Sequence, residues 1–187
     1  MKMKITISGT LGSGKSTVAK IIEKKLRIKR YHSGGFMRKM AEERGMTLNE
    51  LQEIAEKSRE IDDEIDTRQK KLGEEENNFI FEGRLGYHFI PDAYKIYLKT
   101  DTEVAAERIL KAMQEKDEER EKEGLTKNKE EIIKSLKRRR ESEKKRYLEL
   151  YNLNYEDENN YDLIIDTTNI NAEEVANKII KKIEEKN

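Results

Sequence analysis

The 187-residue sequence contains no cysteine and a single proline, Pro91. The absence of cysteine excludes a disulfide framework, a thiolate zinc site and a cysteine nucleophile. No apolar run approaches the length of a membrane span, and the N-terminus lacks the apolar region of a signal peptide. We therefore expect a cytoplasmic protein without a membrane partner.

An excess of charge of one sign is also missing. Lys+Arg and Asp+Glu both number 39, so the formal net charge is zero, although charged residues make up 42% of the chain. A generally basic nucleic-acid surface is not indicated, and we expect no nucleic-acid partner. The length fits one α/β domain with a modest core and a heavily charged surface.

A glycine-rich segment near the N-terminus stands out against these absences: Gly9, Thr10, Leu11, Gly12, Ser13, Gly14, Lys15 and Ser16, followed by Thr17. It matches the phosphate-binding pattern G-x-x-x-x-G-K-[ST] in full. A short alternating strand precedes it, and apolar residues at helical spacing follow it. Glycines let successive backbone N–H groups point inward, and the helix N-terminus adds positive potential. We predict that this segment binds ATP, with Lys15 on the β- and γ-phosphates and Ser16 as a ligand of Mg²⁺.

The rest of the chain alternates short apolar strands with helices. Strands are predicted over residues 3–8, 28–33, 79–81, 94–98 and 161–166. Thr47 and Glu50 form a predicted capping box, and a long basic helix is predicted over residues 129–151. Residues 115–131 are almost entirely charged and are predicted to be a solvated excursion. Five strands alternating with helices predict a parallel sheet covered on both faces, with ligands at the carboxyl ends of the strands.

The phosphate-binding motif alone does not separate kinases from GTPase switches and motors. The sequence has no D-x-x-G element, and residues 128–131 match the guanine-reading N-K-x-D only superficially, because no buried strand precedes them. Motors usually need a strand ending in an acidic pair and a longer chain. Small size, a helical excursion after the second strand and a late basic helix favour a small-molecule kinase.

Several segments together carry a resemblance to a known family: residues 8–17, 33–38, 61–69, 82–85, 138–147 and 161–167. In their order and spacing the chain resembles the archaeal-type cytidylate kinases of the nucleoside monophosphate kinase superfamily. The resemblance implies a three-layer P-loop NTPase fold with a five-stranded parallel sheet and a single domain over residues 1–187. It also implies a helical monophosphate-binding segment at about 34–73 and a mobile charged lid at about 115–146. The implied reaction transfers the γ-phosphoryl group of Mg·ATP to CMP or dCMP, and we expect a monomer with small-molecule partners.

Candidate residues for the acceptor site follow from their chemistry in these segments. Arg38 and Arg84 are predicted to bind the acceptor phosphate, because a planar guanidinium binds phosphate oxygens in pairs. Ser33, one turn before Arg38, is also predicted to bind the substrate. Cytosine offers an amino donor and ring acceptors, so a carboxylate beside a donor side chain complements it. The candidates for reading the base and sugar are Asp62, Asp66, Arg68 and Gln69. The alternatives are ion pairs, between Arg84 and Glu82 and within the charged helix.

Arg139 and Arg146 lie seven residues apart in the predicted basic helix and therefore share a face. Together with Lys15 they are the predicted catalytic residues, because an arginine on the transferring phosphoryl group accelerates such reactions strongly. The alternative is a solvated basic helix whose arginines pair with nearby glutamates. Aromatic residues are not interleaved with this basic cluster, which argues against single-stranded nucleic acid as its ligand.

Three features depart from the family pattern. Gly35 stands where an acidic residue is usual, Ala105 where an arginine is expected, and the charged excursion is longer than the usual lid. Other acceptors therefore stay open, including UMP, AMP or a non-nucleotide hydroxyl with Asp62 or Asp66 as its base. The adenylate kinase type lacks support, because residues 82–85 do not contain its G-[FY]-P-R element. A nucleotide-binding regulator without turnover is the alternative from another class.

Overall fold

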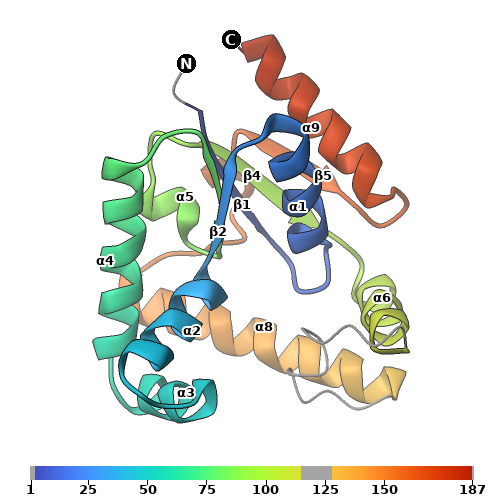
Figure 1. Ribbon diagram of the computed structural model, residues 1–187. Coiled ribbons are helices and arrows are strands. Elements are labelled where there is room, and N and C mark those ends of the chain that lie inside the picture. The colour runs from blue at the N-terminus through green and yellow to red at the C-terminus, as the bar shows by residue number, and fades with distance from the viewer. Residues whose placement is uncertain (1–2, 115–127, 187) are drawn as a thin grey trace.

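The computed structural model describes residues 3–114 and 128–186 of the chain (Figure 1). Its strands form one five-stranded parallel sheet in the order β2-β3-β1-β4-β5. The strands are β1 (Lys4–Gly9), β2 (Lys29–His32), β3 (Phe79–Glu82), β4 (Tyr94–Lys99) and β5 (Leu163–Asp166). All the predicted strands are confirmed, and the phosphate-loop strand β1 lies in the centre of the sheet, where both neighbours position its carboxyl end.

The helices connect and cover these strands. They are α1 (Lys15–Leu26), α2 (Ser33–Glu43), α3 (Leu48–Lys57), α4 (Glu60–Glu75), α5 (Gly86–Phe89), α6 (Thr102–Gln114), α8 (Lys129–Tyr151) and α9 (Ala172–Lys186). The capping box predicted at Thr47 and Glu50 is present, and both of its hydrogen bonds form at the start of α3. The long basic helix is confirmed as α8. The part of the predicted lid at residues 115–127 lies outside the described residues.

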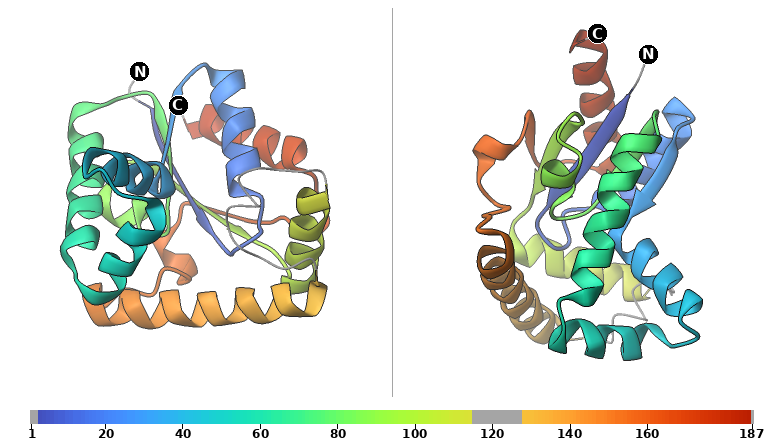
Figure 2. Two further views of the ribbon diagram at one scale, coloured as in Figure 1. Left: turned by 60° about the horizontal axis from the view of Figure 1, so that its bottom comes forward. Right: turned by 90° about the vertical axis from the view of Figure 1, so that its left-hand side faces the viewer.

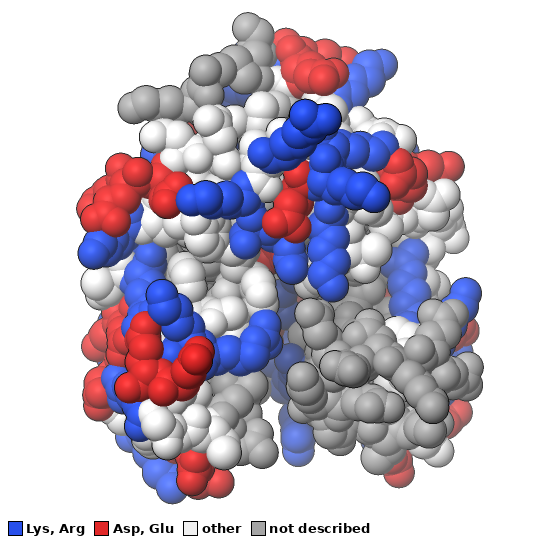
Figure 3. Space-filling model, in the orientation of Figure 1, with Lys and Arg blue, Asp and Glu red and all other residues white. Residues whose placement is uncertain are grey.

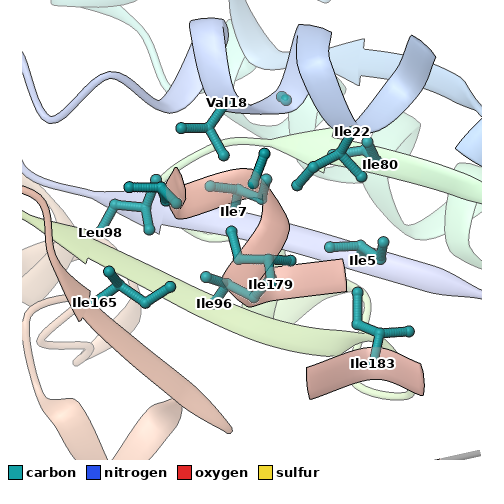
Figure 4. Close-up of a cluster of buried hydrophobic side chains, with 13 residues drawn as sticks. Ile5, Ile7, Val18, Ile22, Ile80, Ile96, Leu98, Ile165, Ile179 and Ile183 are labelled. Atoms are coloured by element: carbon teal, nitrogen blue, oxygen red, sulfur yellow. The ribbon is translucent and has the colours of Figure 1, made fainter. Parts of the chain in front are cut away.

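One face of the sheet is covered by α1 and α9, and an aliphatic core lies between them and the strands (Figure 4). Ile5 and Ile7 alternate along β1 and are fully buried on this face. Their strand neighbours in register, Ile80 on β3 and Ile96 on β4, belong to the same cluster. A core of this kind fixes strand register, because a slip of one residue would turn each isoleucine to the opposite face.

The opposite face of the sheet is covered by α4, α5 and the segment that follows α8 (Figure 2). Its core is aromatic, with Phe79 and Phe81 from β3 and Tyr97 from β4. Tyr155 is almost completely buried there, and its ring lies edge-on to Tyr147 with centroids 5.6 Å apart. The two covered faces complete the predicted three-layer arrangement.

Helix α8 crosses below the carboxyl edge of the sheet, from α6 at one end to α3 and α4 at the other (Figures 1 and 2). Its N-terminal half packs on α6 through Ile132 and Leu136.

Lys and Arg side chains are interspersed with Asp and Glu on the face of the molecule shown in Figure 3. None of the described helices is both long and apolar enough to cross a membrane.

Candidate functional site

The phosphate loop joins β1 to α1 at the carboxyl edge and needs glycine at particular positions. Gly12 and Gly14 have φ angles of 74° and 83°, in the left-handed region that side chains disfavour. A Cβ atom on Gly12 would lie 2.6 Å from the Cβ of Ala105 on α6. The loop therefore packs against α6 so closely that it requires glycine at position 12.

Lys15 lies across this loop. Its Nζ donates to the carbonyl oxygens of Gly9 at 3.0 Å and Thr10 at 2.6 Å. Ser16 and Thr17 are exposed in the first turn of α1, beside the N-terminal amides that attract anions. Within residues 3–114 and 128–186, no group of three acidic or histidine side chains is arranged to hold a metal ion. The role of Ser16 as a ligand of Mg²⁺ stays a prediction.

A cavity of about 230 Å³ adjoins the loop between α1, α6 and the segment after β5. Arg108 on α6 spans it, donating to the carbonyl oxygen of Thr167 at 2.5 Å and of Thr168 at 3.3 Å. Our sequence reasoning did not single out Arg108. An arginine is expected at position 105 of this helix, where the chain has Ala105. Arg108 lies nearly one turn later on the same helix, and that position could have indicated its importance.

A second cavity, of about 390 Å³, lies between the end of β3, α2, α4 and α8. We call it the acceptor cavity. Its volume is in the range of small-molecule sites. Most of the predicted acceptor and lid residues line it, although they come from segments far apart in the sequence: Ser33, Asp62, Asp66, Gln69, Arg84, Arg139 and Arg146.

Arg84 lines the acceptor cavity just past the end of β3. Its carbonyl oxygen accepts from Ser8 Oγ at 2.9 Å, which ties it to the strand that feeds the phosphate loop. Its side chain is 13% exposed, and its Nε donates to Glu143 of α8 at 2.8 Å. Although burial opposes the charge, the Glu143 carboxylate raises the pKa of Arg84, so the guanidinium stays charged. Arg146, also on α8, pairs with Asp62.

Asp66 and Gln69 also line the cavity, one turn apart on α4. Asp66 is 8% exposed and accepts a hydrogen bond from the hydroxyl of Tyr151 at 2.7 Å. Burial raises the pKa of Asp66 to about 6, and the Tyr151 hydrogen bond acts in the opposite direction. The cavity thus brings arginines of α8 and of the segment after β3 together with a carboxylate and an amide of α4.

Two predicted residues do not line the acceptor cavity. Arg38 is exposed on α2, with an Nη atom 3.3 Å from Nε2 of His32. Arg68 of α4 forms ion pairs with Glu43 of α2 and with Glu64. Their roles in substrate binding stay predictions.

Arg84 does not form the ion pair with Glu82 that was considered as an alternative. Glu82 pairs with Arg30 at 2.5 Å, which leaves Arg84 directed toward α8. Arg30 and Glu82 come together because β2 and β3 are neighbouring strands of the sheet. Local sequence does not reveal this order of the strands.

Gly35 departs from the family pattern for a local reason. Nδ1 of His32 accepts the Gly35 N–H at 3.0 Å and so caps α2. A Cβ on Gly35 would lie 3.1 Å from Nε2 of the same ring, tighter than an ordinary contact. The glycine accommodates the histidine cap.

Comparison with known proteins identifies relatives over nearly the whole chain. The family model described as the cytidylate kinase-like family matches residues 4–169. A cytidylate kinase of Archaeoglobus fulgidus is 40% identical, over 98% of this chain and 96% of that protein. One of Methanocaldococcus jannaschii is 38% identical, over 97% and 98%. An S-adenosylmethionine-dependent nucleotide dehydratase of Lacinutrix mariniflava is 35% identical, over 100% of this chain but 37% of that protein.

Solved structures share the fold at low sequence identity. An uncharacterized protein from Eubacterium ventriosum has a TM-score of 0.72 at 18% identity, over 98% of this chain and 99% of that one. A shikimate kinase from Acinetobacter baumannii in complex with shikimate has a TM-score of 0.60 at 18% identity, over 100% and 95%. These similarities bear on the fold alone.

Proposed function

The chain belongs to the cytidylate kinase-like family and is a kinase, and on that premise we propose that it transfers the γ-phosphoryl group of Mg·ATP to CMP or dCMP. The products are ADP and CDP or dCDP. One observation carries the proposal more than any other. The acceptor cavity combines Arg84, whose backbone is hydrogen-bonded to Ser8 of the phosphate-loop strand, with arginines of α8 and with a buried carboxylate and an amide of α4.

These groups complement those of a pyrimidine monophosphate. Its phosphate would lie between Arg84, Arg139 and Arg146, where the anionic charge is neutralised. Its base would reach Asp66 and Gln69, which offer an acceptor and a donor. Binding in this orientation brings the acceptor phosphate toward the γ-phosphate of ATP on the loop, the alignment that in-line transfer requires.

The phosphate loop would bind ATP, the phosphoryl donor. Its N–H groups and Lys15 would hold the β- and γ-phosphates, and Ser16 would hold Mg²⁺ against them. Mg²⁺, when bound, neutralises charge on the phosphate oxygens. The nucleotide base would enter the cavity beside Arg108, where aliphatic side chains from α6 and the segment after β5 form the walls.

The chemical step makes modest demands on proton transfer. An oxygen of the acceptor phosphate attacks the γ-phosphorus, and the bond from that phosphorus to the β–γ bridging oxygen breaks as ADP leaves. Because the attacking oxygen is already anionic, no strong base is needed. The arginines then have to exchange their present carboxylate partners, Glu143 and Asp62, for phosphate oxygens. Charge neutralisation and positioning are the contributions assigned to these residues.

The dehydratase relative does not change this proposal. Its name describes a protein of which 37% matches this chain, so we assign no dehydration chemistry here. UMP, AMP and a non-nucleotide hydroxyl remain the alternative acceptors.

The test is ADP formation from Mg·ATP with CMP, dCMP, UMP, AMP and GMP, beside a Lys15→Ala control. We expect turnover with CMP and dCMP that exceeds turnover with the other acceptors, and loss of it in the control. Turnover with another monophosphate would keep a kinase and overturn the base assignment. ATP binding without acceptor-dependent turnover would overturn the proposal.

A further inference from the structure

The carboxylate of Asp66 is held by contacts from two helices. Its Oδ2 accepts from the Tyr151 hydroxyl of α8 at 2.7 Å, and its Oδ1 lies 3.5 Å from Nε2 of Gln69 on α4. An ionised carboxylate accepts at about four lone-pair positions. Because Asp66 also lines the acceptor cavity, it retains acceptor capacity toward a ligand there.

Tyr151 is itself fixed by aromatic and cationic neighbours. Its ring lies edge-on to Phe89 with centroids 5.8 Å apart, and the guanidinium of Arg59 lies 5.6 Å from its centroid. Tyr147, one turn earlier on α8, lies 6.3 Å from it. A ring held on several sides directs its hydroxyl at one position, so Tyr151 orients Asp66 from across the cavity.

We propose that Tyr151 is a specificity-determining positioning residue, which holds Asp66 as a hydrogen-bond acceptor for a 4-aminopyrimidine base and against a 4-oxopyrimidine base. This inference rests on the proposed function. The amino group of cytosine donates to such an acceptor, whereas O4 of uracil would place oxygen lone pairs against oxygen lone pairs. A buried acceptor left without a donor is costly, and sites built on such a bond reject the wrong analogue strongly.

The same geometry makes base selection depend on pH. A protonated Asp66 would carry an O–H group that donates a hydrogen bond to O4 of uracil. Burial raises the pKa of Asp66 to about 6, and the Tyr151 hydroxyl lowers it, so removal of that hydroxyl should raise it further. The preference for CMP over UMP should therefore fall as the pH falls through about 6.

Other charged groups face Asp66 and contribute to its titration. On α4 they are Asp62, Asp63 and Lys70, and on α8 they are Tyr151 and Arg146, of which Arg146 pairs with Asp62. His88 of α5 is exposed, and its ring contacts Phe89, which in turn contacts Tyr151. Because a histidine titrates in the same pH range, it needs a control.

The experiment measures kcat/KM for CMP and for UMP between pH 5 and 8.5. The 5′-phosphates of the two acceptors titrate alike, so their contribution cancels in the ratio. For the unmodified protein we expect the CMP-to-UMP ratio to fall by up to about tenfold per pH unit as Asp66 takes up a proton. In Tyr151→Phe the ratio should be lower at each pH, with its fall displaced to higher pH.

Further variants distinguish positioning from general damage. Tyr94→Phe removes a tyrosine hydroxyl at the start of β4, outside the acceptor cavity. His88→Gln removes the histidine that titrates in the same pH range. Both variants should keep the pH dependence of the CMP-to-UMP ratio seen in the unmodified protein. Asp66→Asn carries no titrating proton there, so its ratio should be low and flat with pH. Equal losses for CMP and UMP in Tyr151→Phe, or a pH-independent ratio in the unmodified protein, would overturn this inference alone. Failure of the unmodified protein to phosphorylate CMP would overturn the proposed function as well.

Discussion

At the scale of single residues, Arg84 and Asp66 show how burial acts differently on two charged groups. Arg84 has a carboxylate partner on α8, and that partner keeps it charged in a buried place. Asp66 has a neutral hydroxyl as its partner, so burial raises its pKa to about 6. We infer that both charges are kept for ligand binding, since each costs desolvation free energy that stability alone would not select.

Replacement of Arg84 tests the phosphate end of the acceptor cavity. We expect Arg84→Ala to lower kcat/KM for CMP by roughly ten- to a hundredfold, the loss of a charge-assisted bond of about 1.5–3 kcal/mol. Arg84→Lys should recover part of the loss, because a lysine supplies charge without the planar fork. Steady-state kinetics with CMP varied would measure both. Unchanged kcat/KM in Arg84→Ala would contradict this placement.

Arg139 and its neighbour Arg140 form a matched pair. Arg139 lines the acceptor cavity, whereas Arg140 does not line it and pairs with Glu156 of the segment after α8. We expect Arg139→Ala to lower kcat by about a hundredfold or more, in line with arginines on transferring phosphoryl groups. Arg140→Ala should leave kcat near normal and lower the free energy of unfolding by about 1–3 kcal/mol, because it removes one partner of the largely buried Glu156 carboxylate. Equal kcat in the two variants would show that Arg139 does not act in transfer.

Asp66→Asn tests the cost of burying an ionised group. The pKa of Asp66 is higher in the folded protein than the ordinary value of 3.8, so its ionisation lowers stability above about pH 6. We expect Asp66→Asn to raise the free energy of unfolding by about 1–3 kcal/mol at pH 8. The gain should disappear as the pH falls from about 6 to 4, because both forms are then neutral. Denaturant unfolding at pH 8 and pH 4 would measure it, and a gain that is the same at both would contradict the assignment.

At the scale of elements, α6 packs against the phosphate loop and lines the cavity beside it, where we propose that ATP binds. Ala105 leaves room for the tight loop at Gly12, and Arg108 crosses the adjoining cavity. We expect Arg108→Ala to raise KM for ATP about tenfold, since charge-assisted hydrogen bonds to the segment after β5 are lost. KM for CMP should stay within about twofold. A change confined to CMP would reverse the assignment of the two cavities.

The elements themselves were largely predictable from local pattern. The alternation in β1, the capping box at Thr47 and Glu50, and the extent of α8 follow from residues close together in sequence. The short α5 was not predicted, because one turn of helix carries no periodic signal. Placement of Asp62, Asp66 and Gln69 on one face of α4 also follows from helical spacing.

Contacts between distant elements were beyond local pattern. The pair Arg146–Asp62 joins residues 84 apart in sequence, and Arg84–Glu143 joins residues 59 apart. Both depend on where α8 crosses the sheet edge, which tertiary packing decides. Tyr151 was missed for the same reason, since an aromatic residue in a charged helix gives no local indication that it reaches Asp66.

At the scale of the whole molecule, a net charge of zero coexists with a local group of basic residues at the candidate site. The 39 basic and 39 acidic residues balance overall, yet the carboxyl edge of the sheet directs Lys15, Arg84, Arg139 and Arg146 toward the phosphate loop and the acceptor cavity. The acidic groups Glu143 and Asp62 accompany these arginines. We infer that the neutral surface limits nonspecific binding of polyanions while the edge still binds two phosphorylated ligands.

The most direct test of the account is to follow CDP and ADP together from CMP and Mg·ATP, by separating the nucleotides chromatographically. We predict equal amounts of CDP and ADP, both dependent on CMP, and neither with Lys15→Ala. ADP formed without CDP, at the same rate whether or not CMP is present, would contradict the assignment of the acceptor cavity and of the reaction.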